Sequence, residues 1–198
     1  MIPEFRAQLW LLAAALAIHE AEEWNIYGWY KRNYVDMPEG RTPTTIRFFL
    51  VFLSVLGFVW VGIAVCWGDS TIASWIIMPL VGLIVQNIMQ HVYWQVRFKG
   101  YAPGLWTAIV LLAPLSCGIV VTSIVKAMVP LWYLVVLGVV IIPGLLDTVR
   151  ARNTLTRGIL AVHKFSLRCV VLLGLTDAHK AESGDTESRQ AAPTGSTH

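Results

Sequence analysis

The sequence has few charged residues and few cysteines, and both shortages limit what the protein can be. Only 14% of its 198 residues are charged, against 56% that are hydrophobic, whereas a soluble domain has about 25% charged residues. This composition excludes an ordinary soluble domain. The length predicts that the chain forms one domain. The net charge of +3 is not gathered into a basic patch, so nucleic-acid binding is not expected. The three cysteines form no C-x-x-C pair, which argues against a disulfide framework or a zinc ribbon.

A cleavage site for a signal peptide is also missing. An apolar run follows Arg6, but charged and polar residues stand where small residues would be needed: His19, Glu20, Glu22 and Glu23. We therefore expect this segment to be kept as a first membrane span.

Long apolar runs dominate the rest of the chain. A helix needs about 20 mostly apolar residues to cross a bilayer, and five segments fit: residues 7–24, 46–67, 72–98, 105–125 and 129–146. The nine tryptophans suit the membrane interfaces at their ends. The predicted fold is all-α, a polytopic membrane helix bundle of about five transmembrane helices, with a kink expected at Pro143 and Gly144 in the last span.

The chain is expected to have three parts, and residues 1–147 are assigned to the helix bundle. Residues 148–176 carry Lys164 and Arg168 on one helix face and are predicted to form a basic helix that lies in the membrane interface. The alternative is a sixth span, since residues 158–175 are apolar enough to cross the membrane. Residues 177–198 are polar and nearly free of apolar side chains, so a disordered tail is expected there.

Basic residues lie in alternate connections between the predicted spans. They follow the first, third and fifth spans: Lys31, Arg32, Arg41, Arg47, Arg97, Lys99, Arg150, Arg152, Arg157, Lys164 and Arg168. Because Lys and Arg concentrate on the cytoplasmic side of membrane proteins, the N-terminus is expected outside and the C-terminus in the cytoplasm. The predicted location is the bacterial inner membrane, as a multi-pass protein.

Polar side chains gather inside two of these spans. His19 and Glu23 lie one turn apart on a helix, with Glu22 close to the same face, while Asn87 and His91 lie one turn apart in the third span. A charged residue inside a span costs about 2.5–3.5 kcal/mol, so such residues are usually functional.

The two polar faces are expected to meet. The first and third spans run in the same direction, and their polar residues lie at matched depth. Three further residues are expected to support the cluster: Gln90, Arg97 and Asp147. Glu20 is a weaker supporting member, because it lies about 100° around the helix from His19. A purely structural interpretation stays open, in which the carboxylates are headgroup-level charges and the amides join helices.

The motif His19-Glu20-Ala21-Glu22-Glu23 at the end of a first span resembles that of the HXXEE-domain family of small bacterial membrane proteins. The later pattern is similar too, with Asn87 and His91 in a span, then Tyr101-Ala102-Pro103-Gly104 and an apolar helix with Thr107. The resemblance covers about residues 11–145. It supports the fold and the choice of site residues, and it implies no particular reaction.

Several chemistries fit the cluster. His19, Glu23 and His91 could hold a divalent metal such as zinc or iron, with a position left for substrate. Without metal, a buried glutamate beside histidine could act as a general acid or base in an isomerisation or cyclisation. We favour an enzyme that acts on a lipid-like or other hydrophobic small molecule, over a small proton-coupled transporter and over a structural membrane subunit. The expected partners are the lipid bilayer and that small molecule, and a homo-oligomer is compatible with the sequence.

Overall fold

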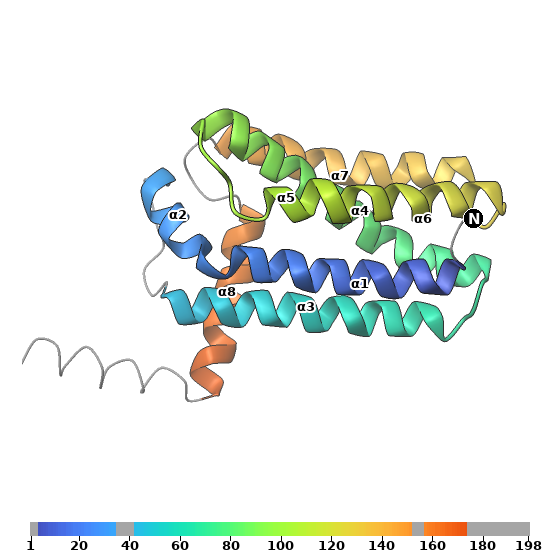
Figure 1. Cartoon of the computed structure of the whole chain (residues 1–198), viewed down its shortest axis with the longest axis horizontal. Coiled ribbons are helices and arrows are strands. Elements are labelled where there is room, and N and C mark those ends of the chain that lie inside the picture. Colours follow the sequence, from blue (N-terminus) through green and yellow to red (C-terminus); the bar gives the residue numbers. More distant parts are fainter. Residues whose placement is uncertain (1–3, 35–41, 152–156, 174–198) are drawn as a thin grey trace, which may run out of the picture.

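The computed structural model describes residues 4–34, 42–151 and 157–173, and these residues form helices and short connections without a strand (Figure 1). Helix α1 (Phe5–Glu22) passes through a 3-10 turn, η1 (Glu23–Asn25), into α2 (Ile26–Asn33). Two long helices follow, α3 (Pro43–Val65) and α4 (Thr71–Phe98). A composite rod comes next, made of α5 (Leu105–Thr107), the π-helical turn η2 (Ala108–Leu112) and α6 (Ala113–Val125), and the chain ends in α7 (Leu131–Ala151) and α8 (Arg157–Leu172).

Four helical segments are long and apolar enough to cross a membrane: Pro43–Val65, Thr71–Phe98, Leu105–Val125 and Leu131–Ala151. They correspond to the second to fifth predicted spans. Helix α1 is not among them, since Arg6, Glu20 and Glu22 all fall within its 18 residues. It nevertheless lies alongside the other rods of the bundle (Figure 1). The composition of these helices marks a membrane protein.

Local sequence accounts for where the helices begin. Thr42 caps α3 through a reciprocal pair of hydrogen bonds with Thr45, and Pro43 occupies the first turn, where its missing N–H costs nothing. Ser70 caps α4 by accepting a hydrogen bond from the Ala73 N–H. Helix α7 ends later than the predicted span, since it continues past Pro143 as far as Ala151.

Packing centres on α1 and α4. Helix α1 packs against α3 and α6, while α4 packs against α3, α6 and α7. A hydrophobic core fills the space between these helices, with Leu9, Leu12, Ile77 and Leu112 fully buried. In contrast, valines along α7 such as Val139 are exposed, as expected for side chains that contact lipid.

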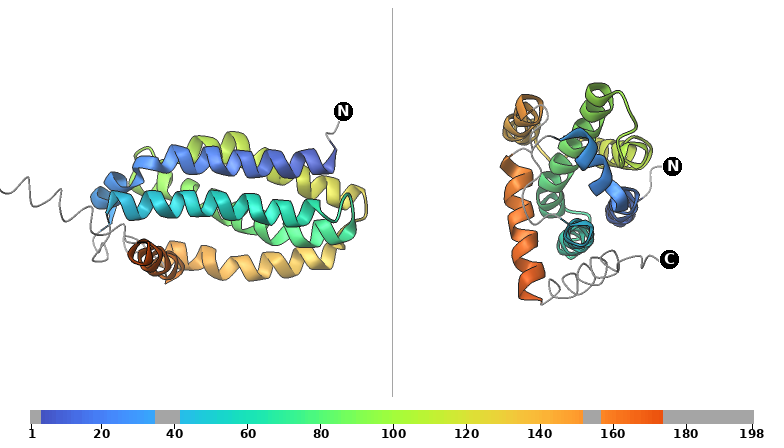
Figure 2. Two further views of the ribbon diagram at one scale, coloured as in Figure 1. Left: turned by 90° about the horizontal axis from the view of Figure 1, so that it is seen from below. Right: turned by 90° about the vertical axis from the view of Figure 1, so that its left-hand side faces the viewer.

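Helix α8 lies across the bundle. When the other long helices are seen end-on, α8 is seen along its length beside α3 (Figure 2). It packs on α3, where Phe165 contacts Phe52 with ring centroids 5.5 Å apart. This crosswise arrangement is compatible with the predicted interfacial helix. The predicted disordered tail, 177–198, lies outside the described residues.

Candidate metal centre

Two of the predicted site residues come from the end of α1. His19 lies in its last turn and Glu23 opens the 3-10 turn that follows, so the side chains project to the same side. Both are buried, with 0% and 8% of their surface exposed. Nε2 of His19 lies 3.4 Å from Oε1 of Glu23.

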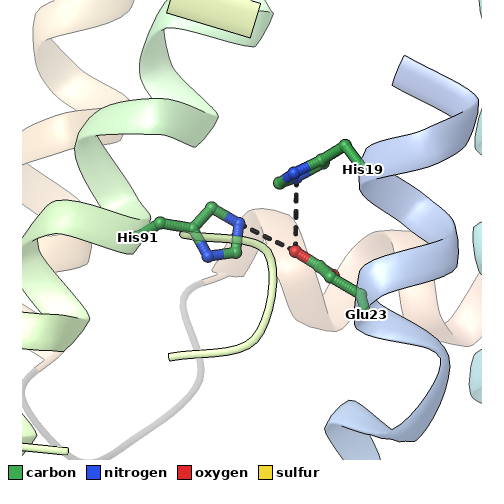
Figure 3. Close-up of side chains that lie close together, drawn as sticks. All are labelled: His19, Glu23 and His91. Carbon is green, nitrogen blue, oxygen red and sulfur yellow. Dashed lines mark ion pairs between the residues drawn. The ribbon is translucent and has the colours of Figure 1, made fainter. Parts of the chain in front are cut away.

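Helix α4 brings His91 to the same carboxylate. Its Nε2 lies 2.7 Å from Oε1 of Glu23, and its ring meets that of His19 edge to face with centroids 4.9 Å apart (Figure 3). The predicted contact between His19 and His91 is therefore confirmed. It arises because α1 and α4 run in the same direction through the bundle, as Figure 1 shows, so residues at matched depth can meet.

His91 is fully buried, yet neither of its ring nitrogens has a hydrogen-bond partner among the described residues. Its Nε2 is paired with the Glu23 carboxylate at 2.7 Å, an ion pair if the imidazole is protonated, whereas its Nδ1 has no partner among those residues. A buried imidazole without hydrogen bonds is costly. A lone pair directed at a metal ion would satisfy it.

The positions of His19, Glu23 and His91 suit such an ion. One ligand atom from each lies within 4.8 Å of the others. Ligands of a tetrahedral zinc, at about 2.0–2.1 Å from the ion, are roughly 3.3 Å from one another. The two separations from Oε1 of Glu23, 3.4 Å to His19 and 2.7 Å to His91, bracket this value, and the histidine ligand atoms lie within 4.8 Å of each other.

Asn87 contacts the cluster from one turn before His91. Its amide nitrogen lies 2.9 Å from Nε2 of His19. The oxygen and nitrogen of an asparagine amide have nearly the same shape, so a flipped amide would turn its oxygen toward a cation bound by His19.

The other motif carboxylate, Glu22, acts through Thr107 of α5. The Thr107 hydroxyl donates to Oε2 of Glu22 at 2.6 Å, and the Thr107 backbone N–H donates to the same oxygen at 2.9 Å. With its proton committed to Glu22, the hydroxyl accepts a hydrogen bond from Nδ1–H of His19 at 2.9 Å. This arrangement leaves the lone pair of His19 on Nε2, the nitrogen that faces Glu23. A carboxylate that orients a histidine through its second nitrogen is usual behind metal ligands.

Tyr101 holds Glu22 from the connection between α4 and α5. Its hydroxyl donates a hydrogen bond to Oε1 of Glu22. Partial burial and the neighbouring Glu22 carboxylate raise the pKa of Tyr101 to about 12. The hydroxyl therefore keeps its proton and donates to Glu22 throughout the neutral range.

Gly104 closes one side of the cluster with backbone. Its φ is +88°, a left-handed conformation that favours glycine. A Cβ at this position would lie 2.7 Å from Oε1 of Glu23, 2.7 Å from Cε1 of His91 and 2.8 Å from Cε1 of His19. The chain thus leaves no room for a side chain there.

A cavity of about 420 Å³ lies on another side of the cluster, bounded by α1, α2, α3 and α4 with Thr148 of α7. Glu23 and Asn87 line it, as do the predicted supporting residues Glu20 and Gln90. The α3 side of the cavity is apolar, with residues such as Phe49, Leu50, Leu53 and Leu56. An ion held by the cluster would therefore face a mostly apolar chamber.

Arg97 and Asp147 do not belong to the group of ligand atoms. Arg97 is exposed, with its guanidinium 5.9 Å from the ring centre of Phe98. It lies roughly 9 Å beyond His91 along the helix axis. Asp147 is partly buried on α7. The three residues that come together as candidate ligands are His19, Glu23 and His91.

A family model described as "Protein of unknown function with HXXEE motif" matches residues 10–119, which is more than half of the chain. The match ends before residue 145, where the predicted resemblance ended. It contains the cluster, Gly104 and Thr107. No curated protein and no solved structure matches the chain.

Proposed function

Since this chain belongs to the HXXEE family, whose description assigns no function, we propose that it is an integral membrane enzyme with one divalent metal ion. His19, Glu23 and His91 hold the ion, and the substrate is a hydrophobic small molecule that enters the adjoining cavity. The motif gains a physical meaning in this proposal. Its first and last residues are ligands, and Glu22 orients His19 through Thr107.

The observation that carries the proposal is the state of His91. It is fully buried, it lies against a carboxylate and a second imidazole, and its ring nitrogens have no hydrogen-bond partner in the described part of the chain. In a purely structural role, Nε2 of His91 would be paired with Glu23 at 2.7 Å, and its Nδ1 would stay without a partner among the described residues. Coordination explains its position and that of Glu23 together.

The ligand set favours zinc. Two histidines and one glutamate form a known set of catalytic zinc ligands. The same set also occurs in iron enzymes that need several open positions. Here the backbone at Gly104 blocks one side, and Asn87 approaches His19 from another, which suits a low coordination number. The side with room is the cavity.

Each protein group has a separate task. When bound, the ion would act as a Lewis acid with a position open to substrate. Thr107 and Glu22 fix the tautomer of His19, and Asn87 places its own side-chain amide at the edge of the site. The apolar wall of α3 limits the access of water and strengthens electrostatic interactions inside.

Metal analysis of the purified protein tests the proposal. We expect one zinc ion per chain after purification without chelators, and its return after chelation and reloading. Elemental mass spectrometry gives the stoichiometry. A chain that takes up no metal under either condition would contradict the proposal, and retained activity in that chain would favour acid–base catalysis by Glu23 and His91.

The orientation of the protein is part of the proposal. If α1 spans the membrane in addition to the four apolar helices, the connections rich in Lys and Arg all lie on one side. Because such connections face the cytoplasm, the site is near the cytoplasmic end of the bundle. We expect a reporter fused at Ser183 to be active only as a cytoplasmic enzyme. Activity of a periplasm-dependent reporter at this position would reverse the orientation.

A further inference from the structure

Glu20 is a buried carboxylate outside the group of ligand atoms. Only 4% of its surface is exposed, and it lines the cavity beside the cluster. It makes no hydrogen bond with another residue that the structure describes. A buried carboxylate in this state needs a donor from elsewhere.

The described residues that line the cavity supply no cation. The described residues around it include amides, aromatic rings and aliphatic side chains, but no lysine or arginine. Glu20 therefore faces the cavity with no positively charged side chain beside it among the described residues.

The surroundings of Glu20 suit an ammonium group joined to a hydrocarbon. Tyr30 and Trp94 line the same cavity with ring centroids 5.9 Å apart, and aromatic faces attract organic cations. The apolar α3 wall runs from Ile46 to Trp60, which is roughly 21 Å along a helix. A hydrocarbon chain can lie along that wall while its polar end reaches Glu20.

From this geometry we infer that the cavity binds an amphiphile with a positively charged amine, held by Glu20, and an apolar chain packed on α3. The inference rests on the proposed function in taking this cavity as the substrate site, and it names the class of substrate. Glu20 recognises the substrate, whereas Glu23 holds the ion.

Three probes of equal chain length test the inference: dodecylamine, dodecanol and dodecanoate. Binding is measured on the full-length protein in phosphatidylcholine nanodiscs, with empty nanodiscs subtracted. The wild type should bind dodecylamine about tenfold or more tightly than dodecanoate, as expected for a charge-assisted hydrogen bond. Glu20→Gln should remove this preference and leave the affinity for dodecanol nearly unchanged.

Two further variants make the result specific. Glu4→Gln changes an exposed glutamate at the start of α1 and should bind all three probes like the wild type. Leu53→Trp fills the apolar part of the cavity and should weaken all three. A preference for the amine that survives Glu20→Gln would overturn the inference.

Metal content separates this inference from the proposed function. Glu20→Gln should keep its full complement of zinc, because Glu20 is not a ligand. Loss of zinc in this variant would overturn the assignment of Glu20 to substrate recognition. A wild type that binds no metal but still prefers dodecylamine would contradict the metal enzyme and leave the amine site standing.

Discussion

Replacement of His91 by alanine should remove the bound metal ion and the activity while the bundle stays folded. Loss of a group that merely orients a ligand costs 10–100-fold in metal affinity, so loss of a ligand itself should cost at least about 100-fold. Glu23→Gln, which keeps the size of the side chain, should have a similar effect because it removes the charge. Competition with a chelator gives the affinity, and thermal unfolding in detergent reports on the fold.

The fold should survive because the substitution breaks a single polar pairing among the described residues, that of His91 with Glu23 at 2.7 Å. Glu23 keeps His19 at 3.4 Å, and Nδ1 of His91 has no partner among those residues to lose. Ser116→Ala, on α6, is a matched control, since it removes another buried polar atom that has no hydrogen-bond partner in the part of the chain that the structure describes. It should keep metal and activity. Full metal content in His91→Ala would show that the cluster is not the metal site.

The substitution Gly104→Ala should destroy the site without changing any ligand. A non-glycine residue in a left-handed conformation costs roughly 1–2 kcal/mol. In addition, the new methyl group would press on both histidines and on Glu23 at distances below 3.0 Å. We expect the loop to move away, metal affinity to fall by at least about tenfold and the melting temperature to drop by several degrees.

Gly138→Ala is the control for this experiment. A Cβ at Gly138, in the middle of α7, would meet nothing within 4 Å, and alanine is the better helix former. This variant should be as stable as the wild type or slightly more so, with normal metal content. If Gly104→Ala binds metal as tightly as Gly138→Ala does, the backbone at Gly104 does not enclose the site.

The sequence was sufficient to predict the meeting of His19, Glu23 and His91. Spacing by four residues places side chains on one helix face, and two spans with the same direction bring equal depths together. Arg97 did not fit this logic, because its distance along α4 carries it past the cluster. Glu20 was the weaker member for its angular offset from His19, and that same offset turns it toward the cavity.

Thr107 and Gly104 could not be assigned their roles from the pattern. Both belong to the resemblance, but their contacts depend on the path of the connection after α4. That path is set by left-handed backbone at Lys99 and Gly104 and by the short helical turn that follows. Local conformations of this kind have no periodic signal in the sequence, whereas the apolar spans do.

The π-helical turn η2 comes directly after Thr107 and accommodates one residue more than an α-helical turn would. Removal of one residue from this turn would restore a regular helix. It would also rotate Thr107 by about 100° relative to α6, away from His19 and Glu22. An insertion or deletion in η2 could therefore separate Thr107 from His19 and Glu22 while every residue of the motif remained. A chain can thus carry the family motif without an assembled site, and the length of η2 distinguishes the two cases.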